Sequence, residues 1–147
     1  YTLAIKARCF EKSGREDEAS RVRREQIDAG STNPAFYTDE ANYLLNKEDY
    51  PGALEIIGKA EARKCANEYT LAIKARCFEK SGREDEASRM RREQIDAGSN
   101  CPAFYADEAN YLIGKNRYDE ARAIIAKAEK VGCANEFTRN IKAKLPD

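Results

Sequence analysis

The sequence contains no histidine, no excess of charge of either sign and no long run of apolar residues. Without histidine the commonest general base of enzymes is missing, so catalysis has little support. A membrane-spanning helix needs about 20 consecutive apolar residues, and no stretch of the sequence approaches that length. The 26 basic and 26 acidic residues cancel. The chain therefore lacks the electrostatic footprint of a general nucleic-acid-binding protein.

The number and spacing of the cysteines predict neither a metal site nor a set of disulfide bonds. There are five, with no Cys-x-x-C pair, and an odd number argues against a disulfide framework. Four of them form two pairs, Cys9 with Cys77 and Cys65 with Cys133, that only reflect an internal repeat. With no histidine partner they predict no metal site and no nucleophile. We expect reduced thiols in a cytoplasmic or other reducing compartment, and no cofactor.

The acidic residues do not form a catalytic pair either. Asp39 with Glu40, and Asp17 with Glu18, are adjacent in the sequence. On a helix adjacent side chains point about 100° apart, so neither pair can share a substrate. We therefore expect a protein that is not an enzyme and has no catalytic residues.

The beginning of the sequence carries no targeting signal. Its first residue is Tyr1, and no basic segment followed by an apolar centre marks a signal peptide. We expect a fragment, a processed chain or a recombinant piece, and a targeting segment could lie upstream.

The most prominent positive feature is a duplication. The stretch YTLAIKARCFEKSGREDEASR occupies residues 1–21 and again residues 69–89. Residues 1–68 align with 69–136 without a gap, with 52 identities in 68. Residues 1–31 differ from 69–99 only at Val22, where the second copy has Met90. Such near-identity indicates recent duplication, gene conversion or deliberate design.

A second, weaker period of 34 residues lies inside the first. It is clearest in four alanines, at Ala19, Ala53, Ala87 and Ala121. The chain therefore divides into units 1–34, 35–68, 69–102 and 103–136, followed by residues 137–147. Self-similarity at 20–50 residues is typical of a solenoid, in which each unit buries its apolar face only against its neighbours.

Each unit carries the pattern of two helices. Leu3, Ala7 and Phe10 lie on one helical face because they are spaced by four and three residues. Ser13 with Glu16 fits a capping box at the start of a second helix. That helix ends at Ala29-Gly30, where glycine supplies a left-handed turn.

The following unit begins with Asn33 as N-cap and Pro34 in the first helical position. Pro51 opens the next helix, and Asn67 caps the one after it. No segment alternates apolar and polar residues, and β-branched residues are scarce, which excludes strands. The pattern predicts nine helices, the last a short one after Asn135.

The 34-residue helix-turn-helix unit resembles the tetratricopeptide repeat. A bulky residue is followed one turn later by a small one, then by a large one, and an alanine opens the second helix. The resemblance implies an all-α fold: a right-handed α-α superhelix, or solenoid, of four repeats, with residues 137–147 as a capping helix and residues 1–147 as a single domain. The bulky, small and large positions are Leu3, Tyr37, Leu71 and Tyr105; Ala7, Ala41, Ala75 and Ala109; and Phe10, Leu44, Phe78 and Leu112.

Some features are more similar to the related pentatricopeptide family, which binds RNA. They are KSGREDEA, the glycine near the end of the second helix, and CANEYT. The residues at the base-reading positions of that pattern are Ile5, Asp39, Ile73 and Asp107. Isoleucine offers no hydrogen bond to a base and aspartate repels phosphate. We therefore rank single-stranded RNA binding below protein binding.

By resemblance, four residues line the concave groove of such an array, at Arg8, Asn42, Arg76 and Asn110. In tetratricopeptide arrays that bind peptide C-termini, asparagine and basic residues there hold the carboxylate, which arginine matches with two parallel donors. The alternative is an internally paired polar groove. In that case Asp39 and Asp107 neutralise the arginine of the preceding unit.

The neighbouring row on the first helices alternates in charge, with Lys6, Glu40, Lys74 and Glu108. It predicts either a ladder of ion pairs between first helices or four solvated charges with little energetic role.

The two ends of the array differ. Phe137, Ile141 and Ala143 restart the repeat, but Arg139 replaces the leucine and Pro146 stops the helix, which favours a polar cap or, alternatively, truncation. At the other end Tyr1, Leu3 and Ile5 would be exposed, which favours self-association or further repeats upstream.

These patterns together predict a non-enzymatic scaffold that binds a peptide or a partner helix in its groove, with no membrane contact. The alternative is a structural, self-assembling array, designed or cut from a longer one.

Overall fold

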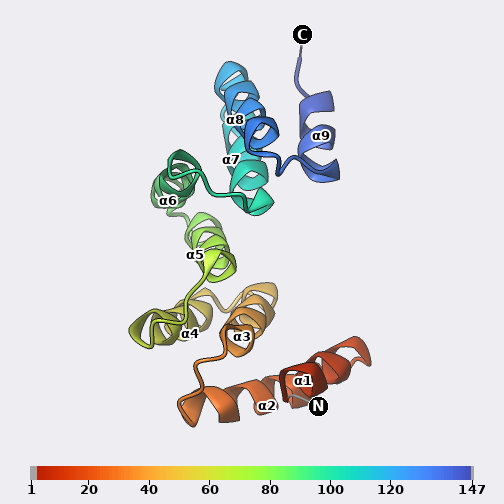
Figure 1. The fold of residues 1–147 in the computed structure, drawn as a ribbon, viewed down its shortest axis with the longest axis vertical. Coiled ribbons are helices and arrows are strands. Elements are labelled where there is room, and N and C mark those ends of the chain that lie inside the picture. The colour runs from red at the N-terminus through yellow and green to blue at the C-terminus, as the bar shows by residue number, and fades with distance from the viewer. Residues whose placement is uncertain (1–2, 147) are drawn as a thin grey trace. The chain divides into compact units, whose positions relative to one another are not determined.

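The computed structural model describes residues 3–146, which form nine α-helices (Figure 1). Among these residues there is no strand, so the predicted all-α class and the number of helices are confirmed. The helices are α1 (Leu3–Lys12), α2 (Glu16–Asp28), α3 (Pro34–Asn46), α4 (Tyr50–Ala62), α5 (Glu68–Lys80), α6 (Glu84–Asp96), α7 (Pro102–Gly114), α8 (Tyr118–Val131) and α9 (Glu136–Ala143).

Most of the predicted helix boundaries are confirmed by the caps. The Asn33 side chain accepts a hydrogen bond from the backbone of Ala35, with proline in the first turn of α3. Asn67 forms a complete capping box with Thr70 at the start of α5. Gly30 ends α2 with a φ of 88°, a left-handed conformation that costs glycine little.

The capping box predicted for Ser13 and Glu16 is wrong. The N-cap of α2 is Arg15, which makes no side-chain capping bond, and the Ser13 hydroxyl instead donates to the carbonyl of Phe10 at 3.0 Å. The Phe10 carbonyl also accepts from the backbone N–H groups of Ser13 and Arg15, so the serine hydroxyl joins a turn that closes the end of α1. The Glu16 carboxylate instead forms an ion pair with Lys47, whose Nζ lies 3.4 Å away.

The described chain divides into two compact units, the first ending at Ser81 and the second beginning at Gly82. In the first, α1 packs on α2, α2 on α3, and α3 on α4, while α5 packs on both α3 and α4. In the second, α6 packs on α7 and α7 on α8, and α9 lies against both α7 and α8 (Figure 1). Each unit thus shows the regular, sequential packing of helical repeats. That the chain forms one domain stays a prediction.

Small side chains occupy the places where helices meet, as the repeat pattern predicts. All four alanines of the first helices and all four that open the second helices are completely buried, which lets the helix axes approach closely. They are Ala7, Ala41, Ala75, Ala109, Ala19, Ala53, Ala87 and Ala121. Tyr37 and Tyr105 are also fully buried, whereas the equivalent Leu3 is 43% exposed.

Candidate interaction surface

Arg8 on α1 and Asp39 on α3 connect the first helices of the first two repeats, on the face that is predicted to line the groove. The Arg8 Nε donates to an Asp39 carboxylate oxygen at 2.8 Å. This hydrogen bond raises the pKa of Arg8, and the attraction of the Asp39 charge adds to the effect. The predicted pairing of Asp39 with the arginine of the preceding 34-residue repeat is therefore present here. Even so, 54% of the Arg8 side chain remains exposed.

The other predicted groove residues also lie on the first helices of their repeats, which are α3, α5 and α7. Asn42 is exposed on α3, one turn after Asp39, and Arg76 is half-buried on α5, which packs beside α3. In the second unit Asp107 is half-buried and Asn110 exposed, both on α7. The first unit therefore places Arg8, Asp39 and Asn42 on adjacent helices.

The neighbouring charge row does not form a ladder, and its glutamates are not solvated. Glu40 is fully buried and accepts hydrogen bonds from the Ser20 hydroxyl at 2.6 Å, Arg23 Nε at 3.0 Å and Arg24 Nε at 3.3 Å. All three donors lie on α2, so Glu40 ties α3 to the second helix of the preceding repeat. Both interpretations of this row were wrong for the glutamates, because one assumed that the row faces the neighbouring first helices and the other that it faces solvent, whereas Glu40 faces α2.

The same cluster recurs in the second unit. Glu108 on α7 is fully buried and accepts from Ser88 at 2.7 Å, Arg91 at 3.0 Å and Arg92 at 2.8 Å, all on α6. One of the two lysines of the row, Lys74 on α5, contacts Glu61 on α4 at 2.9 Å. Glu40, Glu108 and Lys74 thus each bind a second helix.

These buried clusters were missed from the sequence, although a signal was present. Ala19, Arg23 and Ile27 are spaced by four residues and all lie on the buried face of α2, each no more than 1% exposed. An arginine on such a face needs a buried acceptor nearby. Glu40 is that acceptor.

Two equivalent polar clefts between second helices were also not predicted. One lies between α2 and α4 and encloses about 330 Å³, with Lys59 bridging to Asp28 at 3.9 Å. The other lies between α6 and α8 and encloses about 250 Å³, with Lys127 bridging to Asp96 at 3.4 Å. In both, the charges that line the cleft already pair within the chain, so neither presents a free charge of one sign.

The cysteines form no disulfide, and four of the five are buried. Burial raises the pKa of the Cys77 thiol to about 11, and burial likewise raises the pKa of Cys133. A thiol with so high a pKa is a poor nucleophile at neutral pH. Among residues 3–146 no group of three or more potential ligands could hold a metal ion.

The chain matches no family model, and a search of the curated proteins finds no match. Within residues 3–146 every helix is too short or too polar to cross a membrane.

Proposed function

We propose that this chain is a non-enzymatic scaffold of the tetratricopeptide-like class, in which four repeats form a right-handed superhelix capped by residues 137–147. A peptide or partner helix lies along the first helices and contacts Arg8, Asn42, Arg76 and Asn110. The single observation that supports this best is Arg8, which is held by Asp39 while more than half of its side chain stays exposed.

The pairing of Arg8 orients the side chain rather than removing it from use. A guanidinium group has five donors, and the bond to Asp39 uses the Nε donor. A side chain already held in one rotamer loses less conformational entropy when a ligand binds. An acidic side chain or a C-terminal carboxylate on the partner is the chemistry that fits, because it can accept two parallel hydrogen bonds from arginine.

The buried ion pairs of the repeats also favour recognition by the first helices. The buried carboxylates of Glu40 and Glu108 pair with arginines of the second helices. They therefore add no negative charge to the exposed surface of the first helices. Asn42 and Asn110 are exposed and present both donors and acceptors. We therefore place recognition on the first helices.

The proposal is tested by screening a set of acidic peptides for binding by fluorescence polarisation. The variant Arg8→Ala/Arg76→Ala should lose at least tenfold in affinity for any peptide that binds. A matched control is Arg21→Ala/Arg89→Ala, which removes the same charge in both copies of the repeat from exposed positions on the second helices. If both double variants bound as the unmodified chain does, the groove mechanism would be wrong.

A second function, self-assembly into a longer array, is favoured by a separate observation. Leu3 is 43% and Ile5 50% exposed on α1. Ile5 and the exposed Cys9 are four residues apart and therefore share one helix face. An exposed apolar face of this kind marks a site of contact with another protein surface. This function does not depend on the groove residues.

A further inference from the structure

Helices α1 and α5 have the same sequence but different surroundings. Residues 1–12 and 69–80 are identical. Ile73 on α5 is 5% exposed, whereas the equivalent Ile5 on α1 is 50% exposed. Cys77 is completely buried, whereas the equivalent Cys9 is exposed. The environment of α5 therefore shows which surface the outer face of α1 fits.

That surface is the hairpin of α3 and α4. Ile73 and Cys77 belong to one core cluster with side chains of that hairpin, among them Leu44, Ile56 and Ile57. At its edge Lys74 reaches Glu61 at 2.9 Å. We call the α3–α4 surface the first seat.

The hairpin of α7 and α8 forms an equivalent second seat. The buried positions of α4, which are Ala53, Ile56, Ile57 and Ala60, recur unchanged in α8 as Ala121, Ile124, Ile125 and Ala128. Helix α9 occupies this seat as α5 occupies the first. Lys142 reaches Glu129 at 2.9 Å, as Lys74 reaches Glu61, and Asn135 with Thr138 repeats the capping box.

Helix α9 fits its seat less completely than α5. It has 8 residues and buries Thr138 and Ile141, whereas α5 has 13 residues and buries the equivalent Thr70 and Ile73 together with Cys77. The counterpart of Cys77 is Leu145, which follows the end of α9 and is only partly buried.

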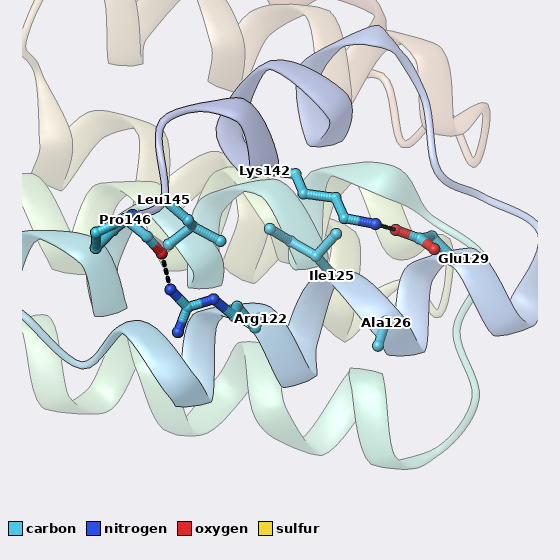
Figure 2. A pocket seen from close by; sticks show the side chains of 7 residues that line it. All are labelled: Arg122, Ile125, Ala126, Glu129, Lys142, Leu145 and Pro146. Carbon is cyan, nitrogen blue, oxygen red and sulfur yellow. Dashed lines mark hydrogen bonds and ion pairs between the residues drawn. The ribbon is translucent and has the colours of Figure 1, made fainter.

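A pocket of about 270 Å³ remains between α8 and the end of α9. Figure 2 shows Leu145 and Ile125 in its lining, with Arg122 on α8 donating to the carbonyl of Pro146. Such space forgoes the contacts that a well-packed interface makes.

We propose that α1 of a second copy of this chain docks on the α7–α8 seat by displacing α9. Helix α1 carries Ile5 and Cys9, the same residues as Ile73 and Cys77 of α5, on one continuous helix, so it fills the seat better than α9 does. Lys6 of the second copy then pairs with Glu129 of the first. The contact joins two different surfaces and can be repeated at each new end, giving a head-to-tail array. Helix α9 limits this association. The inference rests on the self-assembly function above.

Sedimentation velocity over a concentration series tests the proposal with the 147-residue chain. Ile141→Glu places a charge in the α9 contact and should make the chain associate at a concentration at least tenfold lower than the unmodified protein. Adding Ile5→Glu, on the exposed face of α1, should return it to a monomer. A folded Ile141→Glu chain that stays monomeric, or association that survives Ile5→Glu, would overturn the proposal. Asn135→Ala, which removes only the α9 cap, replaces Ile141→Glu if circular dichroism shows that variant to be unfolded.

A charge exchange tests the register. In the associating variant Lys6→Glu should weaken association at least threefold, and Glu129→Lys added to the same chain should restore it. Failure of the second change to restore association would show that α1 does not dock on α8 in this register, contrary to the proposal.

Protection of Cys9 gives a site-specific readout. If α1 docks as α5 does, Cys9 becomes buried like Cys77, and its alkylation rate should fall at least fivefold as the associating variant is concentrated. An unchanged rate in the associated species would overturn the proposal. Asn42→Ala, which removes a proposed groove residue outside both α1 and the α7–α8 seat, should leave association unchanged, so failure of peptide binding and failure of self-assembly are distinguished.

Discussion

Glu40 on α3 accepts a hydrogen bond from the Nε of Arg23 on α2 at 3.0 Å, and neither side chain is accessible to solvent. Removing one partner of such a pair leaves a buried charge uncompensated, which costs about 3–5 kcal/mol. Replacing both by apolar side chains removes that problem. The pair therefore specifies how α3 meets α2 more than it adds to net stability.

Glu40→Gln should lower the free energy of unfolding by about 3–5 kcal/mol, because Arg23 keeps its charge in the interior. Urea denaturation followed by circular dichroism measures the change. Arg23→Met/Glu40→Leu should recover most of the loss.

The matched control is Glu25→Gln, at an exposed position on α2, which should change stability by no more than about 0.5 kcal/mol. A loss below about 1 kcal/mol for Glu40→Gln would contradict the buried pair.

Two glycines should respond to alanine with opposite signs. Gly30 has a φ of 88°, so Gly30→Ala strains the backbone and should destabilise the fold by about 1 kcal/mol. Gly58 lies inside α4, and a methyl group added there meets no neighbouring atom within 4 Å, so Gly58→Ala should stabilise by about 0.5–1 kcal/mol. Denaturant midpoints of the two variants measured in parallel test this, and changes of the same sign would refute it.

One cysteine should react far faster than the other four. Cys9 is exposed and the rest are buried, and Cys77 with a pKa of about 11 is almost entirely protonated at pH 8. Titration of the native dilute protein with a chromogenic disulfide should show a single fast thiol. Cys9→Ser should abolish the fast phase, and a fast phase that persisted in this variant would contradict the burial of the other four cysteines.

Burial of Cys77 also predicts a loss of stability at alkaline pH. Its pKa rises from 9.0 to about 11 on folding, so the folded state holds the proton more tightly than the unfolded state. This contribution is fully present below pH 9.0 and is lost as the pH rises toward 11. Cys77→Ala should show a shallower decline of unfolding free energy over that interval, and an identical decline would argue against it.

The sequence allowed the helices to be predicted more reliably than their contacts. Asn33, Asn67 and Gly30 act within one turn of the chain, so their caps and turns could be predicted locally. Ser13 was misassigned because its hydroxyl donates to the Phe10 carbonyl at the end of α1, whereas the N-cap of α2 is Arg15.

The candidate site divides in the same way. The pairing of Arg8 with Asp39 could be predicted because the repeat places equivalent positions on neighbouring helices. The burial of Glu40 could not, because it depends on α2 and α3 meeting through residues 17 apart. Likewise the exposure of Ile5 beside the burial of Ile73 depends on the neighbour and not on the identical local sequence.

Recognition of a carboxylate by Arg8 is tested most directly by isothermal titration with one acidic peptide in two forms, with a free C-terminal carboxylate and with a C-terminal amide. We expect the free form to bind at least tenfold more tightly, and this difference to vanish in Arg8→Ala/Arg76→Ala. Equal affinity of the two forms for the unmodified chain, or a preference that survives the double substitution, would contradict the account.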